Sequence, residues 1–597
     1  MLSPNTSIGV GYGLEDLGIG SVTTKYDLVV RGGTVVDGKG GVPIEADVAV
    51  RDGSIAAVGK NLGEGRKEID ARGQLVTPGF VDIHTHYDGQ AVWDSRMNSS
   101  SWHGVTTAVM GNCGVGFAPV REEHQQLLIE LMEGVEDIPG TALHEGLQWN
   151  WESFGEYLDL LDTRPRDIDL CAQLPHGALR VYVMGRRAAR LEEATAEDIA
   201  EMRRLTADAM KAGAIGFSTS RTLNHKSVKG DPTPGLRASA DELVGIALGM
   251  KDAGSGVFQL ISDWNTGEPE EEFAMIRRIA EESGRPLSFS LSQRHSVPDL
   301  WQHLFQLVED AVEDGLEIKT QCPPRPIGIL VSLQGSRNPF SFFTTYQEIA
   351  DKPLGQRVAI MRRDDFRRRL MTEIQNMSPE LAATRKYADY ERIFELGDPP
   401  DYEPPRESSV AARAASDGRD PDDLMYDLML KDEGRNFLLA PFANYAYGNL
   451  DVCHDMLASP NTLVGLGDGG AHVGFIADSS YSTYLLAHWG RDRPQGRFPI
   501  EYLVKKHTAD NARAVGLRDR GTLEPGMKAD INVIDFDKLN AHAPYMVTDL
   551  PAGGSRLLQH ADGYTATVVS GAVTYRDGDA TGALPGRLVR GPQPEPA

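Results

Sequence analysis

The feature that most restricts the fold of this chain is the alternation of short apolar runs with amphipathic segments along its centre. The runs VTTAVMGNC, AIGFSTS and GVFQLISD each precede a helical pattern, such as EEHQQLLIELMEGV or EEFAMIRRIAEESG. Repeated βα units predict a parallel sheet whose faces are covered by the connecting helices. The number of repeats over residues 79–520 favours an α/β fold with a closed (β/α)8, TIM-like barrel over a short open sheet.

The two ends of the chain have a different texture from its centre. Residues 26–78 and 521–585 consist of short runs rich in Val and Ile, separated by Gly and Asp-Gly turns. This pattern is typical of β-hairpins, and we expect both ends to contribute to one small β-domain. Residues 1–25 are rich in Gly and Ser and are expected to form a flexible N-terminal arm.

Residues 335–435 interrupt the βα alternation. They contain stretches rich in Arg, Asp and Pro, such as RRDDFRRRL and LGDPPDYEPPRE. We interpret this interval as a helical insertion, or lid, within the barrel. The Pro-rich end LPGRLVRGPQPEPA is expected to be mobile.

Composition excludes several classes of partner. The chain carries 60 Lys and Arg against 86 Asp and Glu, a net charge of −26, which argues against nucleic acid and anionic membranes. Its four cysteines lie far apart, which fits a reducing cytoplasm and not a disulfide scaffold. The absence of an apolar stretch of about 18 residues predicts no transmembrane helix. We therefore expect a cytoplasmic protein, and the sequence leaves a homo-oligomer open.

The strongest local signal is the sequence VDIHTH at residues 81–86. Side chains alternate along a strand, so His84 and His86 should project from the same side of the chain. At the end of a first barrel strand, both imidazoles would reach the mouth of the barrel. Two neutral imidazoles there suit Zn²⁺ or a similar ion, so the motif predicts a metal site.

A second signal is Asp468 in the sequence GLGDGGAH, which follows the apolar run NTLV. On its own this aspartate would be a turn residue among glycines. Combined with the two histidines, it predicts a carboxylate that binds the metal and takes the proton of an attacking water.

The sequences PGFVDIHTHYD, GDGGAH and HTADNARAVGLRDRGTLEPGMKADINVIDFD resemble those of the amidohydrolase superfamily. The sequence GNCG at residues 111–114 is similar to that of its N-acyl-D-amino-acid deacylase, or D-aminoacylase, branch. The resemblance implies a (β/α)8 barrel with a small β-sandwich built from both chain ends. It also implies one or two Zn²⁺ or other divalent ions, held at a centre containing His84, His86, Cys113 and Asp468.

The chain departs from this branch at two places where a histidine is expected, after the fifth and sixth strands. The matching regions GVFQLISDW and PLSFSLSQRH offer Gln259, Ser262, Ser290 and Ser292, and His295 comes several residues after the strand. Either one metal ion suffices, or other ligands replace these histidines. Glu133, near the end of a predicted helix, is one candidate ligand.

Other candidate site residues follow predicted strands. His176 and His225 are candidate catalytic donors that would stabilise developing negative charge. Arg221 and Arg325 could bind a substrate carboxylate, since the guanidinium fork is complementary to it. His472 is a further candidate substrate contact. Each histidine could instead be a packed loop residue, and each arginine a structural ion-pair partner.

These signals favour metal-dependent hydrolysis of a linear amide, a small molecule such as an N-acyl-D-amino acid, with Asp468 as general base. One alternative is a cyclic amidase acting on hydantoin-, dihydropyrimidine- or lactam-like rings. Such relatives use a carboxylated Lys on the fourth strand, and the stretch AIGFSTSRT has none. Another alternative is a non-catalytic scaffold on a degenerate barrel.

Overall fold

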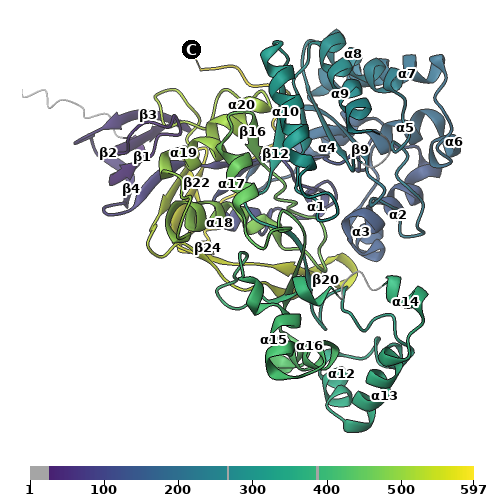
Figure 1. The fold of residues 1–597 in the computed structure, drawn as a ribbon. Helices are drawn as coiled ribbons and strands as arrows, with labels where there is room; N and C mark the ends of the chain where they lie inside the picture. Colours follow the sequence, from purple (N-terminus) through teal and green to yellow (C-terminus); the bar gives the residue numbers. More distant parts are fainter. Residues whose placement is uncertain (1–25, 265–267, 385–388, 597) are drawn as a thin grey trace, which may run out of the picture.

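The computed structural model describes residues 26–264, 268–384 and 389–596, and the predicted arm at 1–25 lies outside them (Figure 1). Eight strands form one parallel sheet in the order β16-β12-β11-β10-β9-β8-β7-β6. Their bounds are β6 Phe80–Asp82, β7 Val105–Met110, β8 Asp169–Pro175, β9 Gly216–Arg221, β10 Val257–Ser262, β11 Leu287–Ser290, β12 Ile318–Cys322 and β16 Thr462–Val464. Strands β7 and β8 are buried along their whole length, as expected when both faces of a parallel sheet are covered.

The first and last strands of this sheet meet and close it into a barrel. Just beyond β6 and β16, Thr85 and Gly469 form a parallel bridge. The side-chain amide of Asn511 donates to the carbonyl oxygens of Val81, at 2.8 Å, and Val464, at 2.7 Å, and so ties β6 to β16. The predicted (β/α)8 barrel is therefore confirmed.

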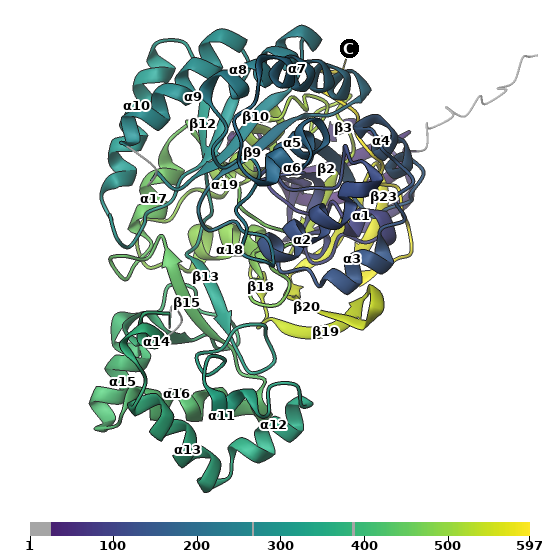
Figure 2. The ribbon, with the colours of Figure 1, turned by 90° about the vertical axis from the view of Figure 1, so that its right-hand side faces the viewer.

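Helices cover the outside of the barrel between successive strands. Figures 1 and 2 show α7, α8, α9 and α10 side by side along one flank. No helix among the described residues is long and apolar enough to cross a membrane. The helices that follow barrel strands are α1 Gln90–Trp93, α2 Gln125–Glu136, α3 Gly140–Gly146, α4 Phe154–Asp162, α5 His176–Met184, α6 Arg186–Ala189, α7 Ala196–Ala212, α8 Ala240–Ala253, α9 Pro269–Ser283, α10 Leu300–Glu313, α17 Asp451–Ala458, α18 Tyr481–Ala487, α19 Ile500–Lys505 and α20 Asn511–Ala514.

Both chain ends enter one nine-stranded sheet beside the barrel. Strand β5 pairs with β1 from the N-terminal part and with β17 from the C-terminal part, so the two ends depend on each other. A separate apolar core that includes Val48 and Ile531 lies within this unit. Its strands are β1 Tyr26–Val35, β2 Ile44–Arg51, β3 Ser54–Gly59, β4 Gly65–Asp70, β5 Leu75–Pro78, β17 Ile531–Ile534, β22 Tyr564–Val569, β23 Ala572–Arg576 and β24 Asp579–Ala580. The predicted β-domain made from both ends is confirmed.

The connection between β12 and β16 contains the predicted helical insertion. Strands β13 Ile327–Val331 and β15 Leu438–Ala443 pair antiparallel at its base, with β14 Phe394–Glu395 on the edge. Figure 2 shows its helices at the bottom of the view, away from the helices that surround the barrel. It has its own apolar core, and its role as a lid stays a prediction. The helices are α11 Thr344–Gln347, α12 Leu354–Met361, α13 Asp364–Gln375, α14 Pro379–Thr384, α15 Val410–Asp417 and α16 Pro421–Met429.

The Pro-rich C-terminal segment does not match the expectation of a mobile tail. The backbone N–H of Leu170 donates to the carbonyl of Arg587 at 3.0 Å, and the N–H of Val589 donates to the carbonyl of Leu170 at 2.7 Å. Leu588 and Val589 are 5% and 3% exposed. The segment contacts the barrel through Leu588 and Val589, two adjacent apolar residues whose effect its Pro-rich composition does not reveal.

A buried ion pair connects the start of β8 to the segment that leads into the C-terminal strands. Asp169 accepts from Arg520 at 2.7 Å and lies 3.2 Å from Lys528, and all three side chains are at most 7% exposed. Despite its burial, the neighbouring Lys528 and Arg520 lower the pKa of Asp169.

We expect Asp169→Asn to lower the apparent melting temperature by about 2–4 °C, because breaking a buried ion pair costs about 3–5 kcal/mol. The control is Asp252→Asn, which removes an exposed pair with Arg203 and should shift melting by no more than about 1 °C. The melting temperatures of both variants are measured and compared with that of the wild type. Equal shifts would contradict a structural role for the buried pair.

Candidate metal centre

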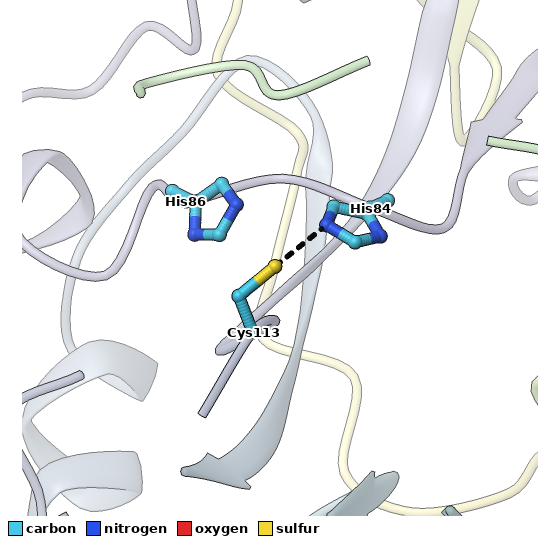
Figure 3. Close-up of side chains that lie close together, drawn as sticks. All are labelled: His84, His86 and Cys113. Atoms are coloured by element: carbon cyan, nitrogen blue, oxygen red, sulfur yellow. Dashed lines mark hydrogen bonds between the residues drawn. The ribbon is translucent and has the colours of Figure 1, made fainter. Parts of the chain in front are cut away.

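Three buried side chains with metal-ligand chemistry meet at the C-terminal mouth of the barrel (Figure 3). His84 and His86 follow β6, and Cys113 follows β7. One ligand atom from each residue lies within 4.8 Å of the others. Figure 3 shows the Cys113 sulfur below and between the two imidazole rings. The structure therefore brings together three of the four predicted metal ligands.

Asp468, the fourth predicted ligand, follows β16 and faces both histidines. Its Oδ1 lies 3.5 Å from Nε2 of His84 and 3.7 Å from Nε2 of His86. Its backbone has a left-handed φ of 45°, and Gly470 beyond it has a φ of 86°. A Cβ at Gly470 would stand 2.8 Å from the carbonyl oxygen of His86. The glycine is thus needed where this loop passes close to the histidine segment.

The orientation of His84 is fixed by a residue that sequence analysis missed. Its Nδ1 lies 2.8 Å from Oε1 of Gln321, at the end of β12, and the amide of Gln321 donates in turn to Ser288. The Gln321 oxygen can only accept, so Nδ1 carries the proton. This leaves the lone pair of Nε2 facing the Cys113 sulfur, 3.3 Å away.

Glu136, also missed, is the carboxylate beside His86. It is the last residue of α2, and its Oε1 lies 3.2 Å from Nδ1 of His86. Glu133, the predicted candidate, instead accepts a hydrogen bond from the Gly140 backbone at 3.0 Å, at the start of α3. The spacing of buried residues along α2 distinguishes Glu136 from Glu133. Glu136 comes four residues after buried Met132, on the apolar face of α2.

Burial and neighbouring charges act on the protonation of this centre. Burial lowers the pKa of His84 to about 4 and raises that of Cys113 to about 11. Burial opposes ionisation of Asp468, but the neighbouring imidazoles of His86 and His84 lower its pKa. The metal-free site therefore contains a neutral His84 and an ionised Asp468, which are the forms that bind metal, whereas the Cys113 thiol must lose its proton to bind.

The chemistry of the side chains at this centre fits a metal ion. Within the described residues, buried Nδ1 of His86 and Oε2 of Glu136 have no well-aligned hydrogen-bond partner. Buried polar groups normally have such partners. Two imidazole nitrogens, a thiol sulfur and a carboxylate oxygen form a donor set typical of four-coordinate zinc.

The positions where two histidines were expected have other roles. Oε1 of Gln259 accepts from the backbone N–H of Cys113 at 3.2 Å and so supports the loop that carries the sulfur. Ser262 donates to Glu272, and Oγ of Ser290 has no partner among the described residues. Ser292 lies on the loop after β11, and His295 stands near Asp389 and Arg392. None of these side chains belongs to the cluster of metal-ligand groups.

The two predicted catalytic histidines have different environments. Nδ1 of His225 lies 3.0 Å from the Ser220 hydroxyl, and its ring interacts electrostatically with His472 and His86 of the mouth. Burial lowers its pKa to about 3, so it is a neutral donor or acceptor. His176 is 1% exposed, with Nδ1 2.7 Å from Thr219 and Nε2 2.9 Å from Glu242. Both ring nitrogens of His176 are engaged, so the geometry favours its structural interpretation.

The predicted substrate arginines both face protein carboxylates. Arg221 makes two hydrogen bonds to Glu272, at 2.6 and 3.0 Å. Arg325 is 1% exposed and donates to Asp478 at 2.7 Å. Substrate binding by these residues stays a prediction that the geometry does not favour, because each guanidinium is already paired. His472 lies nearer the centre, with Nε2 3.6 Å from Oε2 of Glu136.

The chain is similar to known proteins over most of its length. The family model described as "Amidohydrolase family" matches residues 67–575. An uncharacterised protein of Mycobacterium tuberculosis is 28% identical over 94% of this chain and 93% of its own. The D-aminoacylase of Alcaligenes xylosoxydans xylosoxydans is 26% identical over 94% of this chain and 97% of its own. A solved N-acyl-D-glutamate deacylase of Bordetella bronchiseptica, complexed with zinc and a phosphonate inhibitor, has a TM-score of 0.62 at 23% identity and covers 95% of this chain and all of its own.

We expect protein purified without added metal to contain about one zinc ion per chain, measured by elemental mass spectrometry. His84→Ala and Cys113→Ala should remove most of it, because each deletes a donor atom of the cluster. His303→Ala is the control, since that exposed histidine pairs with Glu270 and is not part of the cluster. A wild-type chain that takes up no divalent metal would contradict the site.

Proposed function

Because the chain belongs to the amidohydrolase family of metal-dependent enzymes that hydrolyse carbon–nitrogen bonds, we propose that it deacylates an N-acyl-D-amino acid or a related linear amide. One observation carries the proposal. Four ligand atoms, from two imidazoles, one thiol and one carboxylate, converge at the mouth of the barrel. This is the face of a (β/α)8 barrel where catalysis takes place.

The donor atoms of the proposed zinc site are Nε2 of His84, Nε2 of His86, Sγ of Cys113 and Oδ1 of Asp468. A zinc ion held by these residues would polarise an amide carbonyl and would lower the pKa of an attacking water to about 7. The protein's own contribution is to hold these donors in a dry, preorganised arrangement, since the histidine and cysteine side chains are buried.

Asp468 moves the proton in this proposal. Its carboxylate is ionised in the metal-free site and is 16% exposed, so it faces the space where a substrate can enter. Oδ2 accepts the proton that the attacking water loses, and then delivers it to the departing amine nitrogen. The amide C–N bond breaks, and the products are a carboxylate and a free amine.

His225 is the proposed donor to the developing oxyanion. Its Nδ1 can accept from the Ser220 hydroxyl, which places the ring proton on Nε2. A neutral imidazole with a low pKa donates a hydrogen bond without giving up its proton. We no longer assign this role to His176, because Thr219 and Glu242 engage both of its nitrogens.

The acyl-amino-acid substrate class rests on the relatives. Two that match 94% of this chain are described as a D-aminoacylase and an N-acyl-D-aspartate deacylase. A cyclic amidase would share the barrel and the histidine pair. The strand end where such relatives have a carboxylated Lys is the Ser220–Arg221 end of β9, and Arg221 there is paired with Glu272.

We expect the zinc-loaded protein to release free amine from at least one N-acetyl-D-amino acid in a panel with apolar, acidic and basic side chains. The matching L-isomers and hydantoin and dihydropyrimidine rings should react at least about 100-fold more slowly in kcat/KM, a difference of about 3 kcal/mol in transition-state binding. Turnover of the rings alone would overturn the linear-amide proposal and favour a cyclic amidase.

Asp468→Asn should retain the fold and lower kcat by about 10²–10⁴-fold, because an amide cannot accept the proton of water. The measurements are steady-state kinetics with zinc content and thermal melting of the same preparation. Asp231→Asn, on an exposed loop, is the control. A zinc-loaded Asp468→Asn enzyme that keeps more than about a tenth of wild-type kcat would refute the role of general base.

A further inference from the structure

Glu136 is a buried carboxylate in an electrostatically unfavourable position. It is the last residue of α2 and is 1% exposed. The negative end of the helix dipole and the loss of water both disfavour a charge there. Among the described residues, its side chain forms ion pairs with His86 and His472 and with no Lys or Arg. Packing alone does not explain such a side chain, because an apolar residue would fill the same place without that cost.

Glu136 lies close enough to His86 to orient it as a metal ligand. Nδ1 of His86 lies 3.2 Å from Oε1 of Glu136, an ion pair that is not aligned as a hydrogen bond, while Nε2 lies on the side of Asp468. A proton held on Nδ1 by the carboxylate would leave the lone pair of Nε2 for a metal ion. Histidine ligands commonly have such a carboxylate or carbonyl partner, which fixes the tautomer and increases the basicity of the ligand atom.

The two histidines of the centre differ in this respect. His84 has a neutral partner, Oε1 of Gln321, whereas His86 has a carboxylate. The charge of Glu136 should therefore strengthen the His86 bond to a cation more than Gln321 strengthens the His84 bond. A divalent ion would also balance two carboxylates, the buried Glu136 and the partly exposed Asp468, in a mouth where neither pairs with a Lys or Arg of the described chain.

Glu136 also reaches the loop that follows Asp468. Its Oε2 lies 3.6 Å from Nε2 of His472, whose backbone is held at a left-handed φ of 49°. Nδ1 of His472 is buried without a hydrogen-bond partner among the described residues. One carboxylate therefore contacts a histidine of the metal cluster through one oxygen and a histidine of the mouth loop through the other.

We propose that Glu136 is a positioning residue that orients His86 as a metal ligand and holds His472 at the mouth. This inference rests on the proposed metal site but not on the identity of the substrate. It predicts that removal of the Glu136 charge weakens metal binding even though Glu136 itself is not a ligand.

The test measures the zinc dissociation constant of the full chain by competition with a chelator, for wild type, Glu136→Gln and Glu133→Gln. We expect Glu136→Gln to weaken zinc binding by about 10–100-fold, the usual effect of losing such a partner. Glu133→Gln is the matched control one turn earlier on α2, where the side chain accepts from the Gly140 backbone, and its constant should stay within about twofold of wild type.

The absorption spectrum of the cobalt-substituted protein separates positioning from general loosening of the site. A changed orientation of His86 should shift the d–d bands of Glu136→Gln and leave those of Glu133→Gln unchanged. Melting of the metal-free proteins checks that both variants fold. Should Glu136→Gln fail to fold, Glu136→Asp replaces it, with a shortened carboxylate and a loss expected between those of the glutamine variant and the control.

Three results would overturn the inference. The first is a dissociation constant for Glu136→Gln within about twofold of wild type. The second is weaker binding with an unchanged cobalt spectrum, and the third is an equal loss in Glu133→Gln. A wild-type chain that binds no zinc would overturn the metal site and the proposed function together. If zinc binding and the cobalt spectra are as expected but no amide is hydrolysed, only the proposed function would be overturned.

Discussion

The closure of the barrel and the assembly of the metal centre depend on the same backbone contact. The N–H of Asp468 donates to the carbonyl of His84 at 3.0 Å, and the N–H of His86 donates to the carbonyl of Gly469 at 2.8 Å. These bonds continue the pairing of the first and last strands. The ligand positions are thus set by the hydrogen bonds that close the sheet, and the left-handed backbone of Asp468 is maintained by the surrounding structure.

The surrounding side chains then determine what the metal centre at the mouth of the barrel can bind. Gln321 orients one histidine, Glu136 contacts the other, and Gln259 supports the backbone of Cys113. The three lie on different elements, β12, α2 and β10, so the arrangement exists only in the folded chain. Because folding already positions these groups, a metal ion can bind without reordering the site.

Local patterns were sufficient to predict the barrel, the domain made from both chain ends, the helical insertion and the cluster around His84. The histidine pair could be predicted because alternation along a strand is a local rule. Glu136 and Gln321 were missed because their importance depends on contacts across 50 and 237 positions of sequence. Arg221 is a residue for which the local pattern suggested the wrong kind of contact. Its charge and its place at a strand end suggested a substrate contact, but Glu272 on a later helix already pairs with it.

The centre of the proposed function is a single metal ion bound by two imidazoles, one sulfur and one carboxylate. X-ray absorption at the zinc edge of the loaded protein tests it most directly. We expect one sulfur at about 2.3 Å and about three nitrogen or oxygen neighbours at about 2.0–2.1 Å. A shell without sulfur, or one of six oxygen neighbours, would contradict the claim that Cys113 and the two histidines hold the metal.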